Sequence, residues 1–161
     1  MKKNDAILPF VTVLCVLSVA LMIFVLAAGN NNKTGEFVPP AFDGAAVTGM
    51  PDVPEGRGWS PLTAGDAFVA YVCGEVIAVG QTADVYFTSP ASNTVFLKLR
   101  VLDERDNVIG ETGLIKPGEY VKSVELTRIP ESGADIKLKI MAYEPDTYFS
   151  AGAASLKTKI S

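Results

Sequence analysis

The sequence predicts an all-β protein: an antiparallel, immunoglobulin-like sandwich of about seven strands, preceded by one transmembrane helix and a disordered linker. Three observations predict it: an uncharged segment near the start, a stretch rich in Pro and Gly after it, and short apolar alternations separated by turn residues. We therefore expect three parts. They are a cytoplasmic tip and membrane anchor over residues 1–28, a stalk over 29–66 and an extracellular β domain over 67–161.

Residues 6–28 predict the anchor, because they hold 23 consecutive uncharged side chains. About 20 helical residues cover the ~30 Å hydrocarbon layer, and a lone span satisfies its backbone only as a helix. Lys2 and Lys3 precede the segment, so we expect a single pass of the cell membrane with a cytoplasmic N-terminus and everything after it outside. The alternative is a cleaved signal peptide, whose apolar region is about 7–15 residues and so shorter than this one.

The two cysteines predict no lipid anchor and no internal disulfide. Cys15 lies in the apolar segment, and bulky Leu14 precedes it where lipoprotein signals carry a small residue, so we interpret Cys15 as an apolar residue of the span. Cys73 is the other cysteine of the chain. The exported part must therefore be held together by its core, with Cys73 as a small buried residue or, alternatively, as a cross-link between two copies.

Residues 29–66 predict a stalk, because they hold five Pro and seven Gly in 38 positions. This exceeds the combined share of about 25–30% that marks unstructured segments. The exception is Trp59, because exposing its large apolar ring to water is unfavourable. We expect Trp59 to dock on the domain.

From residue 67 onward the alternation of apolar and polar residues has the period of two that is typical of half-buried strands. Leu97, Leu99 and Val101 share one face of a strand, for example, and Lys98 and Arg100 share the other. The expected strands are 68–79, 83–88, 95–102, 107–112, 119–126, 134–143 and 153–160. The expected core consists of Val72, Val85, Phe87, Leu97, Leu99, Val101, Ile109, Leu114, Val124, Leu126, Ile136, Leu138, Ile140, Leu156 and Ile160.

Two turns separate the central strands. The polar run 103–107, "DERDN", predicts a hairpin tip. In "KPGE", Pro117 fixes φ near about −65° and Gly118 accepts a positive φ, as the central positions of a type II turn require. We therefore interpret "KPGE" as a corner of the sheet and not as a ligand-binding loop.

The order of these signals between Val85 and Leu126 resembles small exported, membrane-anchored β-sandwich proteins of Firmicutes, which are Gram-positive. The resemblance depends on Ser89-Pro90 with Asn93, the aliphatic strand 95–102, the tip 103–107 and the corner 114–118. It implies a fold and a cell-surface location. It assigns no reaction and no site residue.

The residue types present exclude several chemistries. The chain contains no His, which removes Ser-His-Asp and Cys-His nucleophiles and the commonest zinc ligand. The acids cluster at turns, where solvated tips carry them, and the run 103–107 lacks the spacing of a calcium loop. The sequence pI of about 4.8 argues against nucleic acid as a partner. We expect no enzyme, no metal and no cofactor.

One repeated feature suggests a candidate binding face: pairs of cations at alternate positions of three expected strands. If the expected strands 134–143 and 153–160 pair as antiparallel neighbours, at least four of these cations share one outward face, which attracts an anionic polymer of the cell wall. The alternative is a solvated face that lysines keep soluble and whose edges they guard. The first hypothesis for function is a non-catalytic surface protein whose domain contacts another protein or the wall; the second is direct binding of the polymer. The candidate residues are Lys98, Arg100, Lys137, Lys139, Lys157 and Lys159.

Overall fold

The computed structural model describes residues 17–22 and 37–161. Residues 17–22 are helical, and the rest of the expected anchor over 6–28 lies outside the described residues. Within the described ranges, no helix has the length and apolarity needed to cross a membrane. The chain divides into two units, Met1–Val38 and Pro39–Ser161.

The second unit is all-β, as the sequence predicts. Its strands are β1 (Val47–Thr48), β2 (Ser60–Thr63), β3 (Val69–Val72), β4 (Glu75–Val79), β5 (Thr82–Thr88), β6 (Phe96–Leu102), β7 (Val108–Glu111), β8 (Glu119–Glu125), β9 (Asp135–Tyr143) and β10 (Ser150–Ile160).

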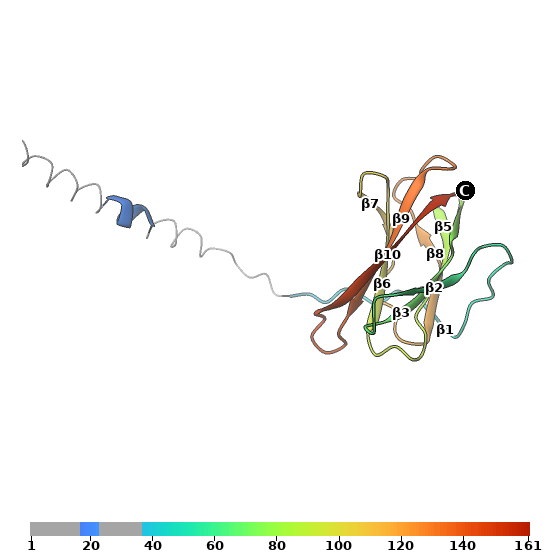
Figure 1. The fold of residues 1–161 in the computed structure, drawn as a ribbon, viewed down its shortest axis with the longest axis horizontal. Coiled ribbons are helices and arrows are strands. Elements are labelled where there is room, and N and C mark those ends of the chain that lie inside the picture. The colour runs from blue at the N-terminus through green and yellow to red at the C-terminus, as the bar shows by residue number, and fades with distance from the viewer. Residues whose placement is uncertain (1–16, 23–36) are drawn as a thin grey trace, which may run out of the picture. The chain divides into compact units, whose positions relative to one another are not determined.

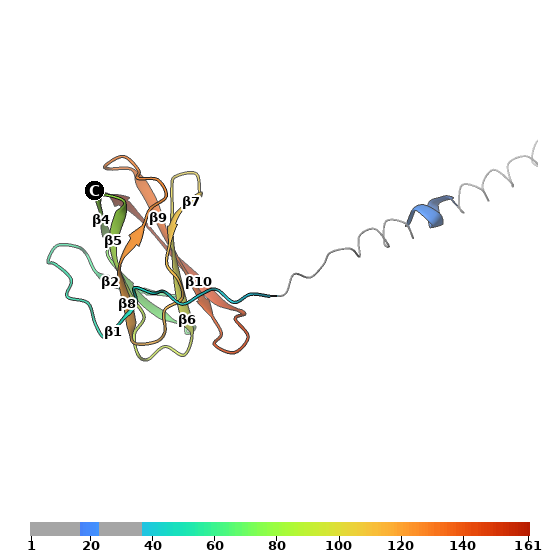
Figure 2. The ribbon, with the colours of Figure 1, turned by 180° about the vertical axis from the view of Figure 1, so that it is seen from behind.

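These strands form one curled, mixed sheet in the order β1-β8-β5-β4-β10-β9-β6-β7, and β3 pairs with both β2 and β5. β10 joins the two halves: it runs antiparallel to β9 from Ser150 to Lys159 and parallel to β4 at Lys159 and Ile160. Figures 1 and 2 show β6, β7, β9 and β10 facing the half that contains β5 and β8. At the far end of the curl, Gly110 of β7 bridges to Leu126, directly after β8.

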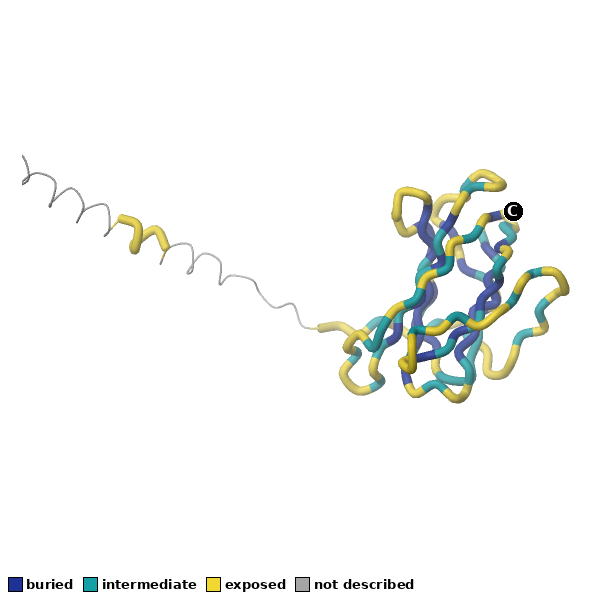
Figure 3. Tube along the Cα trace, in the orientation of Figure 1, coloured by how far each residue is buried: buried dark blue, intermediate teal, exposed yellow. Residues whose placement is uncertain are grey.

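The core lies between these two halves, where the buried stretches of the chain face each other (Figure 3). It forms because alternate residues of each strand are apolar and point inward. Ile136, Leu138 and Ile140 of β9, for example, are buried, while the residues between them are not. The predicted core residues are confirmed as buried, except Leu156, which is half-buried against the core.

The expected strands from residue 83 onward are confirmed with small shifts at their ends. The expected strand 68–79 instead divides into β3 and β4, with Cys73 and Gly74 between them. Gly74 N donates a hydrogen bond to Gly58 O at 3.0 Å, so a second segment of chain crosses at the break. Cys73 is fully buried, as predicted, and burial raises the pKa of its thiol.

The corner at "KPGE" is confirmed. Gly118 has a φ of 81°, and Glu119 N donates to Lys116 O at 3.1 Å, which closes a turn around Pro117 and Gly118. The Glu119 side chain accepts from Lys116 N at 2.8 Å and fixes the same turn. The stretch is a structural corner leading into β8.

The expected stalk over 29–66 is wrong for residues 39–66, which belong to the all-β unit and contain β1 and β2. Asp43 explains part of the difference. Its side chain accepts from Gly113 N at 2.8 Å, and its own N–H donates to Leu114 O at 2.9 Å. Composition indicates disorder in this segment, but long-range hydrogen bonds of this kind are not visible in composition.

The docking of Trp59 is confirmed. Its indole Nε1 donates to Tyr86 O at 3.0 Å, and its ring stacks on Tyr71 with centroids 4.6 Å apart. Tyr86 has a positive φ of 46°, at an irregularity in the pairing of β5 with β8. The indole thus satisfies a carbonyl that the irregularity turns away from the sheet ladder.

We predict that Gly113→Ala lowers the free energy of unfolding by about 3 kcal/mol, because an added Cβ would lie 2.5 Å from Asp43 N and 2.6 Å from its Cα. Backbone atoms cannot move aside as a flexible side chain can. Urea unfolding measures the effect. The control is Gly44→Ala, where nothing lies within 4 Å of the added atom. Equal stability of the two variants would contradict the close approach.

Candidate binding face

The structure brings the six predicted cations onto one face of the sheet, the outer face of β6, β9 and β10. They lie there because the residues between them point into the core. The register sets the rows: Lys139 lies opposite Arg100 on one side, and Lys137 lies opposite Lys157 on the other. We call this surface the cation face. Its residues are Lys98, Arg100, Lys137, Lys139, Lys157 and Lys159.

Three carboxylates partly neutralise the cation face, and none of them was among the predicted site residues. Glu111 of β7 lies 2.9 Å from Lys98 Nζ and 2.9 Å from Arg100 Nε. Burial raises the pKa of Glu111, but hydrogen bonds and charges from Lys98 and Arg100 outweigh it and hold that pKa below its usual range. Glu111 is therefore an anion with two cationic partners. The sequence signal for it is its position at the end of the strand that pairs with β6.

Lys98 differs from its expected role. Its side chain is only 11% exposed and forms an ion pair with Glu111, so it is not available to a ligand as a solvated charge. Period-two alternation places a residue on a face but says nothing about how much of it neighbouring side chains cover. Lys98 therefore lies on the predicted face, but as a largely covered cation with Glu111 as its partner.

The other two carboxylates form ion pairs at the end of the face nearest the hairpin tip between β6 and β7. Asp106 pairs with Lys137, and Asp135 lies 3.5 Å from Lys159 Nζ. In residues 37–161, Lys139 and Lys157 have no ion-pair partner. These two lysines, of which Lys157 is exposed and Lys139 is half-buried, are the open, that is unpaired, charges of the cation face among the described residues.

The opposed cations are unfavourable for the fold by themselves. Like charges directly opposite each other on neighbouring strands destabilise a sheet by a few tenths of a kcal/mol to about 1 kcal/mol. The chain has two such pairs in adjacent rows, Arg100 with Lys139 and Lys137 with Lys157. An anion bound between the rows would relieve both repulsions. In each pair one cation already has a carboxylate partner, Glu111 for Arg100 and Asp106 for Lys137, which offsets part of the repulsion.

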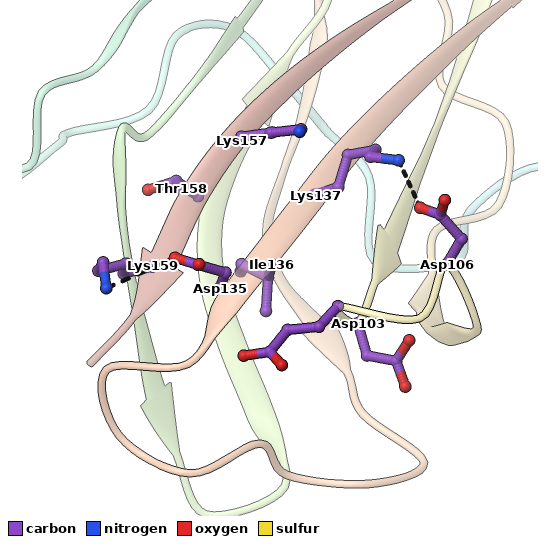
Figure 4. Close-up of a pocket in the computed structure, with 9 residues that line it drawn as sticks. Asp103, Asp106, Asp135, Ile136, Lys137, Lys157, Thr158 and Lys159 are labelled. Atoms are coloured by element: carbon purple, nitrogen blue, oxygen red, sulfur yellow. Dashed lines mark hydrogen bonds and ion pairs between the residues drawn. The ribbon is translucent and has the colours of Figure 1, made fainter.

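A shallow depression of about 540 Å³ lies at the end of the cation face that adjoins the hairpin tip between β6 and β7. In Figure 4, Lys137 reaches across to Asp106, while Lys157 and Lys159 extend from β10. Four carboxylates and three lysines line it, so its charge is mixed: Asp103, Glu104, Asp106, Asp135, Lys137, Lys157 and Lys159. A polyanion would thus contact the centre of the face around Lys139 more favourably than this depression.

The hairpin tip is confirmed, and Asp103 holds it together. Its carboxylate accepts hydrogen bonds from Asn107 Nδ2, Asn107 N and Arg105 N, and Arg128 forms an ion pair with it. The side-chain hydrogen bond from Asn107 contributes most to lowering the pKa of Asp103 to about 2, against the effect of burial. The hydrogen-bonding capacity of the Asp103 carboxylate is thus taken up by its own loop and by Arg128. Within residues 17–22 and 37–161, no group of three acidic, His or Cys side chains is placed to hold a metal ion.

Comparison with protein-family models, curated proteins and solved structures yields no match to this chain.

We predict that the hairpin tip loses stability in acid. The pKa of Asp103 is about 2 in the folded protein, against about 3.9 for an unperturbed Asp, so its contribution is complete above about pH 4 and is lost as the pH falls toward 2. The measurement is the urea midpoint of wild type and Asp103→Asn between pH 6 and pH 2. The midpoints should differ at pH 6 and converge near pH 2.

Asp146→Asn is the control, since Asp146 is an exposed acid in the separate loop between β9 and β10. A difference between wild type and Asp103→Asn that is constant across this pH range would show that the Asp103 carboxylate is not the stabilising group.

Proposed function

We propose that the protein is a non-catalytic, single-pass membrane-anchored module that presents an immunoglobulin-like sandwich outside the cell, where the cation face binds an anionic polymer of the cell wall. The observation that carries the proposal is the row of opposed cations on β6, β9 and β10. It is supported by the open lysines Lys139 and Lys157, and by the 23-residue uncharged segment near the N-terminus.

The charge of the whole chain makes this face unusual. The chain carries 14 basic and 18 acidic residues, a net charge of −4, so general attraction to anions is not expected. On the cation face, by contrast, six cations meet three carboxylates. A local surface of this sign attracts a polyanion electrostatically, and the attraction weakens as salt rises. A phosphate-rich wall polymer has the required chemistry.

The spacing of the cations suits a linear polymer. Rows on one face of a strand are two residues apart, or about 6.6 Å at ~3.3 Å per residue. The row of Lys137 and Lys157 and the row of Arg100 and Lys139 are neighbours at this spacing. A chain of phosphodiesters joined by short alcohols carries its charges at a comparable interval. It would meet one cation row per phosphate.

A protein partner is the second candidate. The observation that favours it is that, within residues 37–161, the side of β10 away from β9 pairs with a strand only at Lys159 and Ile160, because a sheet edge offers backbone groups to an added strand. Chemical cross-linking on intact cells, followed by recovery of the full chain from membranes, tests this candidate. A cross-linked protein species supports it, and recovery of the chain linked only to wall material counts against it.

We predict that changing Lys139 and Lys157 together to Ser removes salt-sensitive retention of the full chain on purified walls. The free energy of unfolding should stay equal or rise, by up to ~1 kcal/mol, because one member of each opposed pair is removed. Sedimentation with walls at low and high salt measures retention, and urea unfolding measures stability.

The control is Lys122→Ser combined with Lys116→Ser, which removes the same charge from residues outside the cation face. Retention by the Lys139 and Lys157 variant equal to that of wild type would reject the cation face as the binding surface. Equal losses in both variants would show that total charge, and not this face, determines retention.

A further inference from the structure

Aromatic side chains gather at one end of the all-β unit, where the loop between β9 and β10 meets the start of the unit. Phe42 packs edge-on against Phe96 with ring centroids 5.0 Å apart, and the ring of Phe96 lies 6.1 Å from that of Tyr148 in the loop. Figures 1 and 2 show the chain entering the unit beside this loop. We call this surface the aromatic end, and its residues are Phe42, Phe96, Tyr148 and Phe149.

The loop presents Phe149 outward through its own backbone. Tyr148 N donates to Glu144 O and Glu144 N donates to Phe149 O, both at 2.9 Å, which closes the loop across its base. Tyr148 has a positive φ of 56°, which is uncommon for a bulky side chain. Tyr148 packs near Phe96 in this conformation, while Phe149 beside it stays exposed to water.

The exposed aromatic surface of the unit is concentrated at this end. Within residues 39–161, the two exposed phenylalanines are Phe42, at 44%, and Phe149, at 74%, and both belong to the aromatic end. The ring of Phe96 lies between Phe42 and Tyr148 and joins them into one patch. Contiguous apolar patches on a surface mark sites that contact a protein or a membrane.

The length of chain before the unit identifies the lipid bilayer as the apolar surface within reach. The uncharged segment ends at Ala28, and the all-β unit begins at Pro39. The ten residues between them span at most about 35 Å when fully extended. Phe42 lies three residues into the unit. The aromatic end is therefore joined to the segment 6–28 by a short length of chain.

We propose that the aromatic end rests on the lipid bilayer that the segment 6–28 crosses, with Phe149 inserted at the boundary between headgroups and acyl chains. This inference rests on the membrane anchor of the proposed function. Aromatic side chains are favoured at this depth of a membrane. Lys116 is exposed, and its Nζ lies 4.9 Å from the centroid of the Phe42 ring. Its charge reaches a lipid phosphate while its stem lies along the apolar surface.

The charges at this end make the contact apolar and not electrostatic. The loop carries two exposed acids, Glu144 and Asp146, which offset the charge of Lys116. The carboxylates of Asp43 and Glu119 accept hydrogen bonds from backbone N–H groups. The contact therefore forms on neutral phosphatidylcholine and withstands salt, whereas the attraction of a polyanion to the cation face weakens as salt rises.

The contact sets the height of the cation face above the membrane. Phe96 begins β6, and Leu102 at its other end lies opposite Lys137. Six residues of strand span about 20 Å at ~3.3 Å per residue. The row of Lys137 and Lys157 thus lies about 20 Å along the strands from the aromatic end. The polymer that this row reaches is the part of the wall nearest the membrane.

Paramagnetic relaxation in nanodiscs tests the contact. The isotopically labelled full chain is placed in phosphatidylcholine that carries gadolinium-chelating headgroups, with one chain per disc, so that a second copy cannot supply the contact. The amide signals of Phe149 and Lys116 should broaden most. Those of Ser132 should broaden least, because Ser132 lies in the loop at the other end of β9. The pattern should persist at high salt. Equal broadening at Phe149 and Ser132 would overturn the proposal.

Phe149→Ser separates the contact from the effect of the short connection to the segment 6–28. The substitution removes an exposed ring, so the fold is preserved, and it should reduce the population in contact about tenfold and flatten the pattern at Lys116. Val79→Ser is the matched control. It removes a side chain that is 61% exposed at the end of β4, beside the C-terminal end of β10. An unchanged pattern in Phe149→Ser, or equal changes in both variants, contradicts the contact.

The outcomes for the contact and for the proposed function are separate. Release of the full chain from membranes at alkaline pH would show that the segment 6–28 is not an anchor, and it would reject both. A chain that stays in the membrane and is retained on walls, but shows no relaxation pattern, rejects the contact alone. A chain with the relaxation pattern but without salt-sensitive retention on walls rejects polymer binding by the cation face and leaves the contact standing.

Discussion

The register between β9 and β10 is the interaction on which the rest of the structure depends. Leu138 lies opposite Leu156 and Lys137 lies opposite Lys157, so this register turns leucines of both strands toward the core and lysines of both strands outward. A slip of one residue would turn the lysines into the core and the leucines into water. The same strand, β10, then passes to β4 at its last two residues and carries the sheet around the core. The register that builds the core therefore also places the lysines on the outer face.

This register explains why the cation face lies on a folded domain that is acidic overall. The buried rows supply the stability, since each fully buried aliphatic side chain contributes about 1.5–3 kcal/mol. Two rows of opposed cations lower that stability by much less. Glu111 and Asp106 offset part of the repulsion through their ion pairs with Lys98, Arg100 and Lys137. Lys139 and Lys157 have no ion-pair partner within residues 37–161, so their charges are not offset in this way. Such a departure from local stability is expected where a surface serves binding.

The sequence predicted what depends on short-range patterns and failed where distant segments meet. Alternation located the strands around Leu99 and Leu138, and the turn chemistry of Pro117 and Gly118 gave the corner. The same alternation turned the cations outward on their strands, and the strand pairing of the structure brings all six onto one face. The alternation could not reveal that Glu111 forms an ion pair with Lys98. Nor could it reveal that Asp43, in the expected stalk, accepts a hydrogen bond from Gly113, just before the corner. Nor could it place β10 between β9 and β4, because strand order is a property of the whole fold.

We propose that the outer face of β6, β9 and β10 binds a polyanion. Backbone amide spectra of isotopically labelled full-length chain in nanodiscs, recorded during titration with poly(glycerol phosphate), test it most directly. We expect the shift changes to concentrate at Arg100, Lys139 and Lys157 and to reverse when salt is added. Changes that concentrate instead around Trp59, or an unchanged spectrum at saturating polymer, would contradict it.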